Sequence, residues 1–278
     1  MTTTERPEIG QSAVANGIRT NYLEDGKDSD PTVLLVHGSG PGVTSYANWR
    51  LVIPALAENF HVVAPDMVGF GYSDRPQGVQ YSLDTWADQT LGVMDALGIE
   101  KAHLVGNSFG GGIALRLATR HPDRVKKLVL MGSMGVDFPI TEGLDAVWGY
   151  DGTLEGMKRV MGYFAYDESL TSGDLAQARY EGATQPGFQE AFSSMFPAPR
   201  QRWVESMTVP EEEIRKLPHR TLIVHGREDK VIPLSNSYKL EELLDNADLS
   251  VFSHCGHWSM IERRDDFNRQ VRDFFLSE

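Results

Sequence analysis

Gly106-Asn107-Ser108-Phe109-Gly110 is the stretch that decides the fold of this chain. The apolar run 102–105 (AHLV) before it is typical of a buried strand, and 111–120 (GGIALRLATR) after it is apolar at helical spacing. A chain that passes at once from strand to helix must turn sharply, and glycines at both ends of the pentapeptide leave room for that turn. The pattern predicts a serine hydroxyl exposed just past the end of a strand.

Two more strand-like runs farther along the chain end in polar loops. Run 221–224 (TLIV) precedes Asp229, and run 249–252 (LSVF) precedes His257. Loops that follow parallel strands meet at one edge of a sheet, so an acid and a histidine can join the serine there. The order serine, acid, histidine is that of α/β-hydrolases, and it differs from the orders of chymotrypsin-like and subtilisin-like proteases.

These three residue types have a shared chemistry. A serine hydroxyl becomes a strong nucleophile when a base takes its proton, so we expect His257 to serve Ser108 as base and Asp229 to orient the histidine. Glu228 and Glu262 are competing acids near the same loops, but Asp229 stands farther past its strand than Glu228. Other histidines also lie at strand ends, but Gly256 before His257 and the final helix after it give a loop that can reach the serine. Those other histidines are His37, His103 and His225.

The oxyanion formed when a serine attacks a carbonyl needs preorganised donors. We expect one to be the backbone N–H of Phe109, at the start of a helix. The glycine-rich loop 37–42 (HGSGPG) follows another strand and is expected to supply the second donor. A phosphate-binding loop is the rival interpretation, but the loop lacks the lysine and the glycine spacing of the known phosphate motifs.

Further apolar, β-branched runs at 33–36, 61–64 and 125–131 predict inner strands of a parallel sheet. Between them, Ser82 is a plausible N-cap for an amphipathic helix that stops at Gly98. Strands that alternate with helices predict a mostly parallel, doubly wound α/β sheet.

Segment 137–213 interrupts this alternation. It is rich in proline and holds 11 of the chain's 26 aromatic residues. We expect a helical lid inserted after the sixth strand, which covers the strand ends and forms an apolar pocket. Residues 1–136 and 214–278 then form the α/β-hydrolase core, with a sheet of about eight strands.

Composition narrows the partners. The formal net charge of −13 over 278 residues argues against nucleic acid, and no apolar run is long enough for a membrane span. We expect a cytoplasmic protein without a secretory signal. The single cysteine, Cys255, excludes an internal disulfide, and we expect it to pack rather than to react. Neither a metal nor another cofactor is expected, because His254, Cys255 and His257 have no second ligand group at helical spacing.

Six motifs together resemble those of the meta-cleavage product hydrolases. They are HGSGPG (37–42), NWR (48–50), PDMVGFGYSDRP (65–76), GNSFGGG (106–112), GREDKVIPL (226–234) and CGHW (255–258). The similarity runs from about residue 7 to residue 275 and includes the lid, and it is strongest to the branch that handles 2-hydroxymuconic semialdehyde and its 6-alkyl analogues. These α/β-hydrolases act in aromatic hydrocarbon catabolism.

The resemblance implies hydrolysis of the C5–C6 bond of a 2-hydroxy-6-oxohexa-2,4-dienoate, giving 2-hydroxypenta-2,4-dienoate and a small carboxylic acid. It also implies a triad of Ser108, Asp229 and His257, with oxyanion donors from Ser39 and Phe109. The residues expected at the dienoate end are Asn48, Asn107, Arg179 and Trp258. By position, the residues expected to face the acyl group are Met134, Leu144, Trp148 and Ile232.

Several alternatives stay open at this point. Without the resemblance, Arg179 would be read as a surface ion pair with Glu181 or Asp174. A serine carboxylesterase would use the same triad, and a non-catalytic ligand-binding homologue would share the fold. The 6-substituent, the choice between an acyl-enzyme and a gem-diol route, the source pathway and the oligomeric state, a homo-oligomer included, are also open.

Overall fold

A mostly parallel sheet lies at the centre of the structure. The computed structural model describes residues 6–171 and 173–277. Within this part of the chain, eight strands form one sheet in the order β1-β2-β4-β3-β5-β6-β7-β8. The strands are β1 (Gln11–Ala15), β2 (Ile18–Asp25), β3 (Thr32–Val36), β4 (His61–Pro65), β5 (Ala102–Asn107), β6 (Val125–Met131), β7 (Thr221–Gly226) and β8 (Ala247–Phe252).

The six strands predicted from apolar runs all appear, with ends that differ by at most two residues. From β3 to β8 the neighbours pair in parallel, whereas β2 pairs antiparallel with both β1 and β4. The inner strands β4, β5 and β7 are buried along their whole length. Continuous apolar runs are therefore explained by helices on both faces, and the predicted fold class is confirmed.

The hairpin of β1 and β2 has no counterpart among the apolar runs, because many of its side chains face water. Asn16 and Gly17 turn the chain between the two strands, with φ angles of 51° and 79°. Positive φ at both central residues is the signature of a type I′ hairpin turn, which favours an Asn-Gly pair. The local turn signal identifies this hairpin where apolar periodicity does not.

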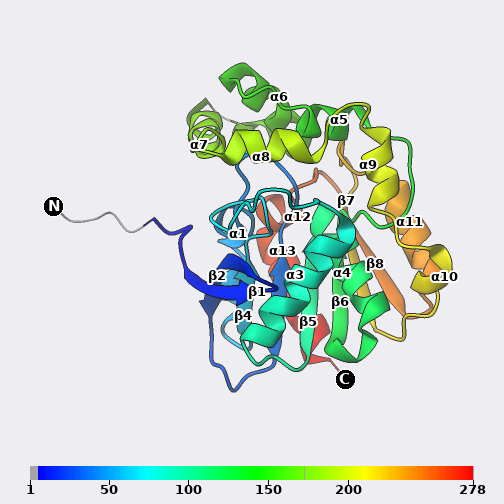
Figure 1. The fold of residues 1–278 in the computed structure, drawn as a ribbon. Helices are drawn as coiled ribbons and strands as arrows, with labels where there is room; N and C mark the ends of the chain where they lie inside the picture. Colours follow the sequence, from blue (N-terminus) through cyan, green and yellow to red (C-terminus); the bar gives the residue numbers. More distant parts are fainter. Residues whose placement is uncertain (1–5, 172, 278) are drawn as a thin grey trace.

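Helices cover both faces of the sheet. Figure 1 shows α3 (Leu83–Ala96) and α4 (Phe109–Arg120) on one face and α13 (Arg264–Leu276) on the other. Ser82 caps α3 as predicted, because its Oγ accepts a hydrogen bond from the Thr85 N–H at 3.1 Å. The remaining core helices are α1 (Ser45–Trp49), α2 (Ile53–Leu56), η1 (Pro122–Arg124), α11 (Leu234–Leu243) and α12 (Ser259–Glu262).

Helices alone fill the described chain between β6 and β7, where a helical insertion is expected. They are α5 (Glu142–Trp148), α6 (Leu154–Phe164), η2 (Glu168–Thr171), α7 (Gly173–Ala183), α8 (Phe188–Met195), α9 (Gln201–Ser206) and α10 (Glu211–Ile214). Figure 1 shows α5–α8 across the top of the molecule, over the carboxyl ends of the strands. The α10 helix instead lies beside α4, where Glu213 pairs with Arg116 at 3.3 Å. The described residues contain no helix long and apolar enough to cross a membrane.

Candidate active site

Ser108 lies at the turn between β5 and α4, with φ of 55° and ψ of −117°. Side chains rarely occupy this region, and holding one there costs about 1–3 kcal/mol. A Cβ on Gly106 would clash with the Gly110 carbonyl, and one on Gly110 would clash with the carbonyl oxygen of Val36. The glycines predicted to permit the turn are therefore sterically required.

Asp229 and His257 are in direct contact. His257 Nδ1 donates a hydrogen bond to Asp229 Oδ2 at 2.6 Å, and both side chains are almost fully buried. With Nδ1 occupied, Nε2 is the nitrogen available as a base. Ser108 and His257 line the same cavity, and the Ser108 hydroxyl makes no hydrogen bond within the described residues. Contacts between nucleophile and base are often loose before substrate binds.

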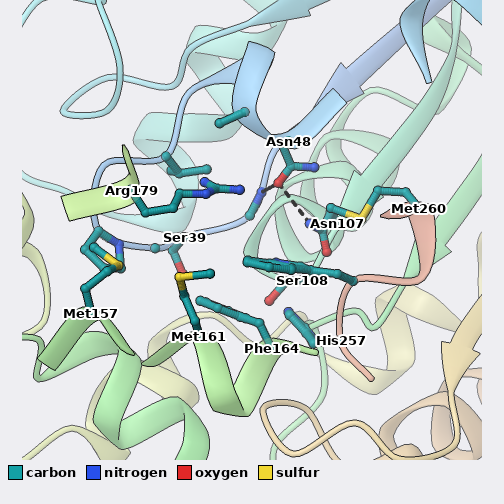
Figure 2. A pocket seen from close by; sticks show the side chains of 16 residues that line it. Ser39, Asn48, Asn107, Ser108, Met157, Met161, Phe164, Arg179, His257 and Met260 are labelled. Carbon is teal, nitrogen blue, oxygen red and sulfur yellow. Dashed lines mark hydrogen bonds between the residues drawn. The ribbon is translucent and has the colours of Figure 1, made fainter. Parts of the chain in front are cut away.

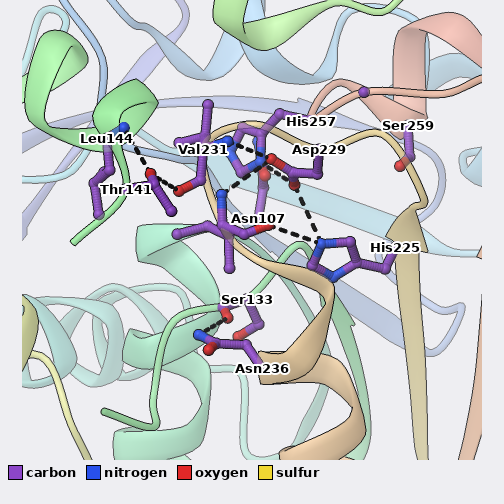
Figure 3. A network of polar contacts seen from close by, with 12 residues as sticks. Asn107, Ser133, Thr141, Leu144, His225, Asp229, Val231, Asn236, His257 and Ser259 are labelled. Atoms are coloured by element: carbon purple, nitrogen blue, oxygen red, sulfur yellow. Dashed lines mark hydrogen bonds and ion pairs between the residues drawn. The ribbon is translucent and has the colours of Figure 1, made fainter. Parts of the chain in front are cut away.

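Donors surround the carboxylate of Asp229. Its Oδ1 accepts the N–H groups of Val231 and Ile232 at 2.7 and 3.0 Å, and His225 Nε2 lies 3.4 Å from Oδ2. Figure 3 shows Asp229 between the two imidazoles. Burial alone would raise the pKa of Asp229, but the charge of His257 and the hydrogen bonds from both histidines outweigh it and hold the pKa below its usual range. The carboxylate therefore stays ionised beside the base.

The two competing acids have a different task. Glu228 Oε2 accepts the N–H of Cys255 at 3.0 Å. Glu262 Oε2 accepts the N–H of Gly256 at 2.7 Å, while its Oε1 accepts those of Tyr166 and Asp167 in the lid at 2.8 and 2.9 Å. Both carboxylates bind backbone of the histidine loop and not the His257 ring, which agrees with Asp229 as the acid.

The loop after β3 is held in one conformation by His37. Its Nε2 accepts the Met67 N–H at 2.9 Å, so Nδ1 carries the proton and donates to the Gly38 carbonyl at 2.7 Å. Burial lowers the pKa of His37, which keeps the ring neutral. The Ser39 side chain is fixed as well, because Trp148 Nε1 donates to Ser39 Oγ at 2.9 Å. A preorganised loop of this kind is what an oxyanion site requires.

Ser39 and Ser108 line one cavity, and the backbone N–H of Phe109 is the first in helix α4. The first N–H groups of a helix have no partner inside the helix, and the dipole adds to their effect. The structure thus brings the two predicted oxyanion donors to the same end of β5.

Figure 2 shows the cavity, which contains polar groups without partners. Asn48 Oδ1 accepts hydrogen bonds from the Gly38 N–H at 3.2 Å and from Asn107 Nδ2 at 3.0 Å. The second amide atoms, Asn48 Nδ2 and Asn107 Oδ1, are buried without a hydrogen bond. A buried polar atom without a partner is costly, so two such atoms on asparagines of the cavity wall indicate that this wall is built for a polar ligand.

Arg179 extends into this cavity from α7 (Figure 2). Its guanidinium lies 5.2 Å from the ring centre of Trp258 and makes no ion pair within the described residues. Burial, reinforced by the nearby charge of Arg50, lowers the pKa of Arg179 to about 10, so the group remains charged at neutral pH. The ion pairs with Glu181 or Asp174 are absent, and Glu181 instead accepts a hydrogen bond from Gln177 at 2.8 Å.

None of the four residues expected around the acyl group is part of the wall of this cavity, and their role at the acyl group stays a prediction. Met134 and Leu144 are buried in the core. Trp148 stacks on Phe196 with the ring centres 4.3 Å apart, and its Nε1–H donates to Ser39 Oγ. The backbone N–H of Ile232 donates to Asp229 Oδ1. The cavity has a volume of about 40 Å³, and none of these four side chains is part of its wall.

The sequence prediction missed most apolar side chains of the wall, among them Met157, Met161 and Phe164 on α6 and Met260 on α12. The α6 residues recur at helical spacing, which signals one apolar face but does not reveal what that face covers. Phe164 stacks against both Trp258 and His257, with ring centres 4.9 and 5.8 Å apart. The lid therefore contacts the catalytic histidine directly.

Two further features of the structure bear on reactive thiols and metal ligands, namely Cys255 and a cluster of acidic residues with a histidine. Burial raises the pKa of the Cys255 thiol to about 12, so it stays protonated, as a packing role requires. Within the described residues the only group with metal-ligand spacing is Glu24, Asp28 and His61. It lies at the amino end of β4, opposite the serine end of the parallel strands, and Glu24 already binds His61 at 2.7 Å.

Comparisons with known proteins agree with this geometry. Residues 31–264 match the family model of the alpha/beta hydrolase fold. A 2-hydroxymuconate semialdehyde hydrolase of Pseudomonas sp. (strain CF600) is 57% identical over 96% of this chain and 94% of its own, and a 2-hydroxy-6-oxo-2,4-heptadienoate hydrolase of Pseudomonas putida is 53% identical over 98% of each.

Solved structures give the same picture. The meta-cleavage product hydrolase CumD of Pseudomonas fluorescens IP01, a serine-to-alanine mutant complexed with acetates, superposes with a TM-score of 0.96 at 56% identity, covering 97% of this chain and 98% of that one. The 2-hydroxy-6-oxo-6-phenylhexa-2,4-dienoate hydrolase of Rhodococcus sp. strain RHA1 superposes with a TM-score of 0.88 at 34% identity, covering 96% and 98%.

Proposed function

The chain belongs to the α/β-hydrolase fold family and, within it, is a meta-cleavage product hydrolase, and on this premise we propose how its cavity cleaves a dienoate. The enzyme hydrolyses the C5–C6 bond of 2-hydroxy-6-oxohexa-2,4-dienoates, giving 2-hydroxypenta-2,4-dienoate and a carboxylic acid. One observation carries the assignment of roles. Among the described residues, Ser108, His257, an arginine without an ion pair and two asparagines, each with one buried amide atom that has no hydrogen bond, line a single cavity.

The dienoate end of the substrate binds at Arg179. Its guanidinium forms a charge-assisted pair with the substrate carboxylate, supported by the face of Trp258. Asn48 Nδ2 and Asn107 Oδ1 take the oxygen at C2, as the free donor and the free acceptor of the cavity. This orientation directs C6 toward Ser108.

Carbon is a poor leaving group, so the dienol must first become a ketone. A proton moves from the C2 hydroxyl to C5, and His257 is the base of the cavity that can carry it. In the keto form, the electron pair of the breaking C5–C6 bond is delocalised through C3 and C4 onto the oxygen at C2. The dienoate product leaves with that pair.

Attack at C6 places negative charge on its oxygen. The N–H groups of Ser39 and Phe109 are the proposed donors to this oxyanion. Two routes share the arrangement: Ser108 attacks C6 and forms an acyl-enzyme that water hydrolyses, or Ser108 polarises a water that attacks C6 directly. Rapid-quench sampling distinguishes them, because only the acyl route releases dienoate before carboxylic acid.

We propose hydrogen, methyl or ethyl as the group at C6. The relatives named for such small substituents are 57% and 53% identical to the chain, whereas the structure named for a 6-phenyl substrate is 34% identical. The cavity is also small. A larger acyl group would need the buried side chains next to it to move.

The decisive experiment is an assay of the purified protein against the 6-methyl dienoate and against p-nitrophenyl acetate. We expect kcat/KM for the dienoate to exceed that for the ester by orders of magnitude. A carboxylesterase would show the reverse preference, and a ligand-binding homologue would turn over neither. A cytoplasmic location is a further part of the proposal, supported by a single, unpaired cysteine, and cell fractionation tests it.

A further inference from the structure

A second pocket lies beside the active-site cavity, between α1 and α7, and is called the outer pocket below. Its wall includes Glu8, Tyr46, Arg50, Tyr72, Leu175 and Gly182. The volume of the outer pocket is about 260 Å³, and that of the active-site cavity is about 40 Å³. The space outside the reaction chamber is thus larger than the chamber.

The two pockets share a wall. Ala47 and Arg179 line both of them. Arg179 extends across one side of the cavity in Figure 2, on the flank away from Met260. A movement of this one flexible side chain would therefore join the outer pocket to the chamber that holds Ser108.

The outer pocket also carries a cation. Arg50 is partly exposed, and its Nη1 donates to the carbonyl of Ala47 at 2.8 Å, which fixes the guanidinium at the end of α1. Arg50 makes no ion pair within residues 6–171 and 173–277. Over the described part of the chain, the wall of the outer pocket carries one carboxylate, Glu8, and two guanidinium groups, those of Arg50 and Arg179, so its net charge is positive. A positive recess stands out on a chain of formal charge −13.

We propose that the outer pocket is the entrance for the anionic substrate and that Arg50 captures the substrate carboxylate before Arg179 receives it. This inference rests on the proposed function. A protein of net negative charge repels a dienoate at long range, and a local cation in a recess offsets that repulsion and raises the encounter rate. The apolar C6 end passes Arg179 first and reaches Ser108, and the carboxylate stops at the shared wall.

Charge is tested with Arg50→Gln and Arg50→Lys. At about 0.01 M salt the Debye length is ~30 Å, and at about 1 M it is ~3 Å. We expect Arg50→Gln to lower kcat/KM for the 6-methyl dienoate by about 3- to 10-fold at low salt and by less than about 2-fold at high salt. Arg50→Lys should restore most of the loss, and the neutral ester should show no salt-dependent difference.

Volume is tested at Gly182, which lines the outer pocket but not the active-site cavity. Outside its own helix, the nearest atom to a Cβ at this position is the Gly42 carbonyl oxygen at 4.0 Å, so a side chain fits without a clash. Gly182→Phe should lower kcat/KM for dienoate and ester alike by about 10-fold or more, because a blocked entrance slows every substrate. Gly162→Phe is the matched control, since Gly162 lies on lid helix α6 with nothing within 4 Å of its Cβ and lines neither pocket.

The outcomes separate the two proposals. If the wild-type protein does not cleave the dienoate, the proposed function fails. If it does, and Gly182→Phe retains wild-type kcat/KM while Arg50→Gln shows no salt-dependent loss, the outer pocket is not the entrance and the function stands. Should Gly182→Phe fail to fold, as judged by its thermal melt, the two Arg50 variants decide alone.

Discussion

Ser108 and His257 are the residues on which turnover depends most directly. We expect Ser108→Ala and His257→Ala each to lower kcat for the dienoate by about 10³-fold or more, the loss typical of a missing nucleophile or base. His257→Ala should also slow ketonisation, which stopped-flow absorbance follows separately from cleavage. Near-full activity of Ser108→Ala would show that the nucleophile is elsewhere.

The role proposed for Arg179 is narrower than that of the triad, because it concerns one functional group of the substrate. Arg179→Gln should cost about 1.5–3 kcal/mol in kcat/KM for the dienoate, the contribution of a hydrogen bond to a charged group. Hydrolysis of neutral p-nitrophenyl acetate should change little. Equal losses on both substrates would indicate that the arginine only supports the lid.

Met134 remains a predicted determinant of substrate size, although it does not line the cavity. Its backbone N–H donates to the Ser108 carbonyl at 3.0 Å, so it lies next to the nucleophile, and its side chain is buried. Overpacking costs about 1–3 kcal/mol, so the wild type should favour 6-methyl over 6-phenyl dienoate by roughly 5- to 150-fold. Met134→Ala should narrow that ratio of kcat/KM values. Comparable wild-type values for the two substrates would contradict the prediction.

Among the structural elements, the lid and the loop that carries His257 are connected by a set of hydrogen bonds, which is called the joint below. The Phe164 carbonyl at the end of α6 accepts the N–H groups of His257 and Trp258 at 2.7 and 3.2 Å. Glu262 joins the same two segments, because one of its oxygens binds the loop and the other binds the lid. The position of the catalytic base therefore depends on the lid.

Glu262→Ala tests this joint. A small displacement of a catalytic group can cost up to about 10²-fold, so we expect kcat for the dienoate to fall by roughly 10- to 100-fold, with a smaller change in KM. Asp151→Ala is the control, since Asp151 binds the Thr153 N–H at 3.0 Å within the lid and has no bond to the histidine loop. Similar kcat losses in the two variants would mean that general lid stability, and not the joint, is responsible.

The elements also show what sequence patterns can and cannot predict. The inner strands are predictable because both faces are covered, which makes each a continuous apolar run. Ser82 and Gly98 mark the ends of α3 because caps are local. Helix α6 is different. Its apolar face is visible in the sequence, but only the folded chain reveals that Met157, Met161 and Phe164 face the cavity.

For the whole molecule, Ser108, His257 and the four residues predicted for the dienoate end do line one cavity, whereas the extent of that cavity was not predictable. Apart from Arg179, the residues proposed to bind the dienoate belong to short local motifs, such as GNSFGGG and CGHW. None of Met134, Leu144, Trp148 and Ile232 is part of the cavity wall, because which side chains reach the cavity depends on how lid and core close together. No local sequence pattern encodes the shape of the cavity between lid and core. Trp148, for example, donates its indole N–H to Ser39 Oγ.

Stability against acid is a property of the whole fold that Asp229 should influence. A carboxyl whose folded pKa is lowered adds stability above its unfolded pKa of about 3.9, and this contribution is lost as the pH falls toward the folded pKa. The pKa of Asp229 is held low although its burial opposes this, because the charge of His257 and the bonds from His225 and His257 prevail. Asp229→Asn should therefore melt several degrees below the wild type at pH 7, since 1 kcal/mol corresponds to about 2–4 °C in domains of this class. The difference in Tm between Asp229→Asn and the wild type should narrow as the pH drops below about 4.

The control is Asp273→Asn, at an exposed carboxylate that binds the neighbouring Arg272. Its Tm should follow that of the wild type at every pH. A gap for Asp229→Asn that stays constant from pH 7 to about pH 3 would mean that shape, and not the ionised carboxylate, accounts for its share of the stability.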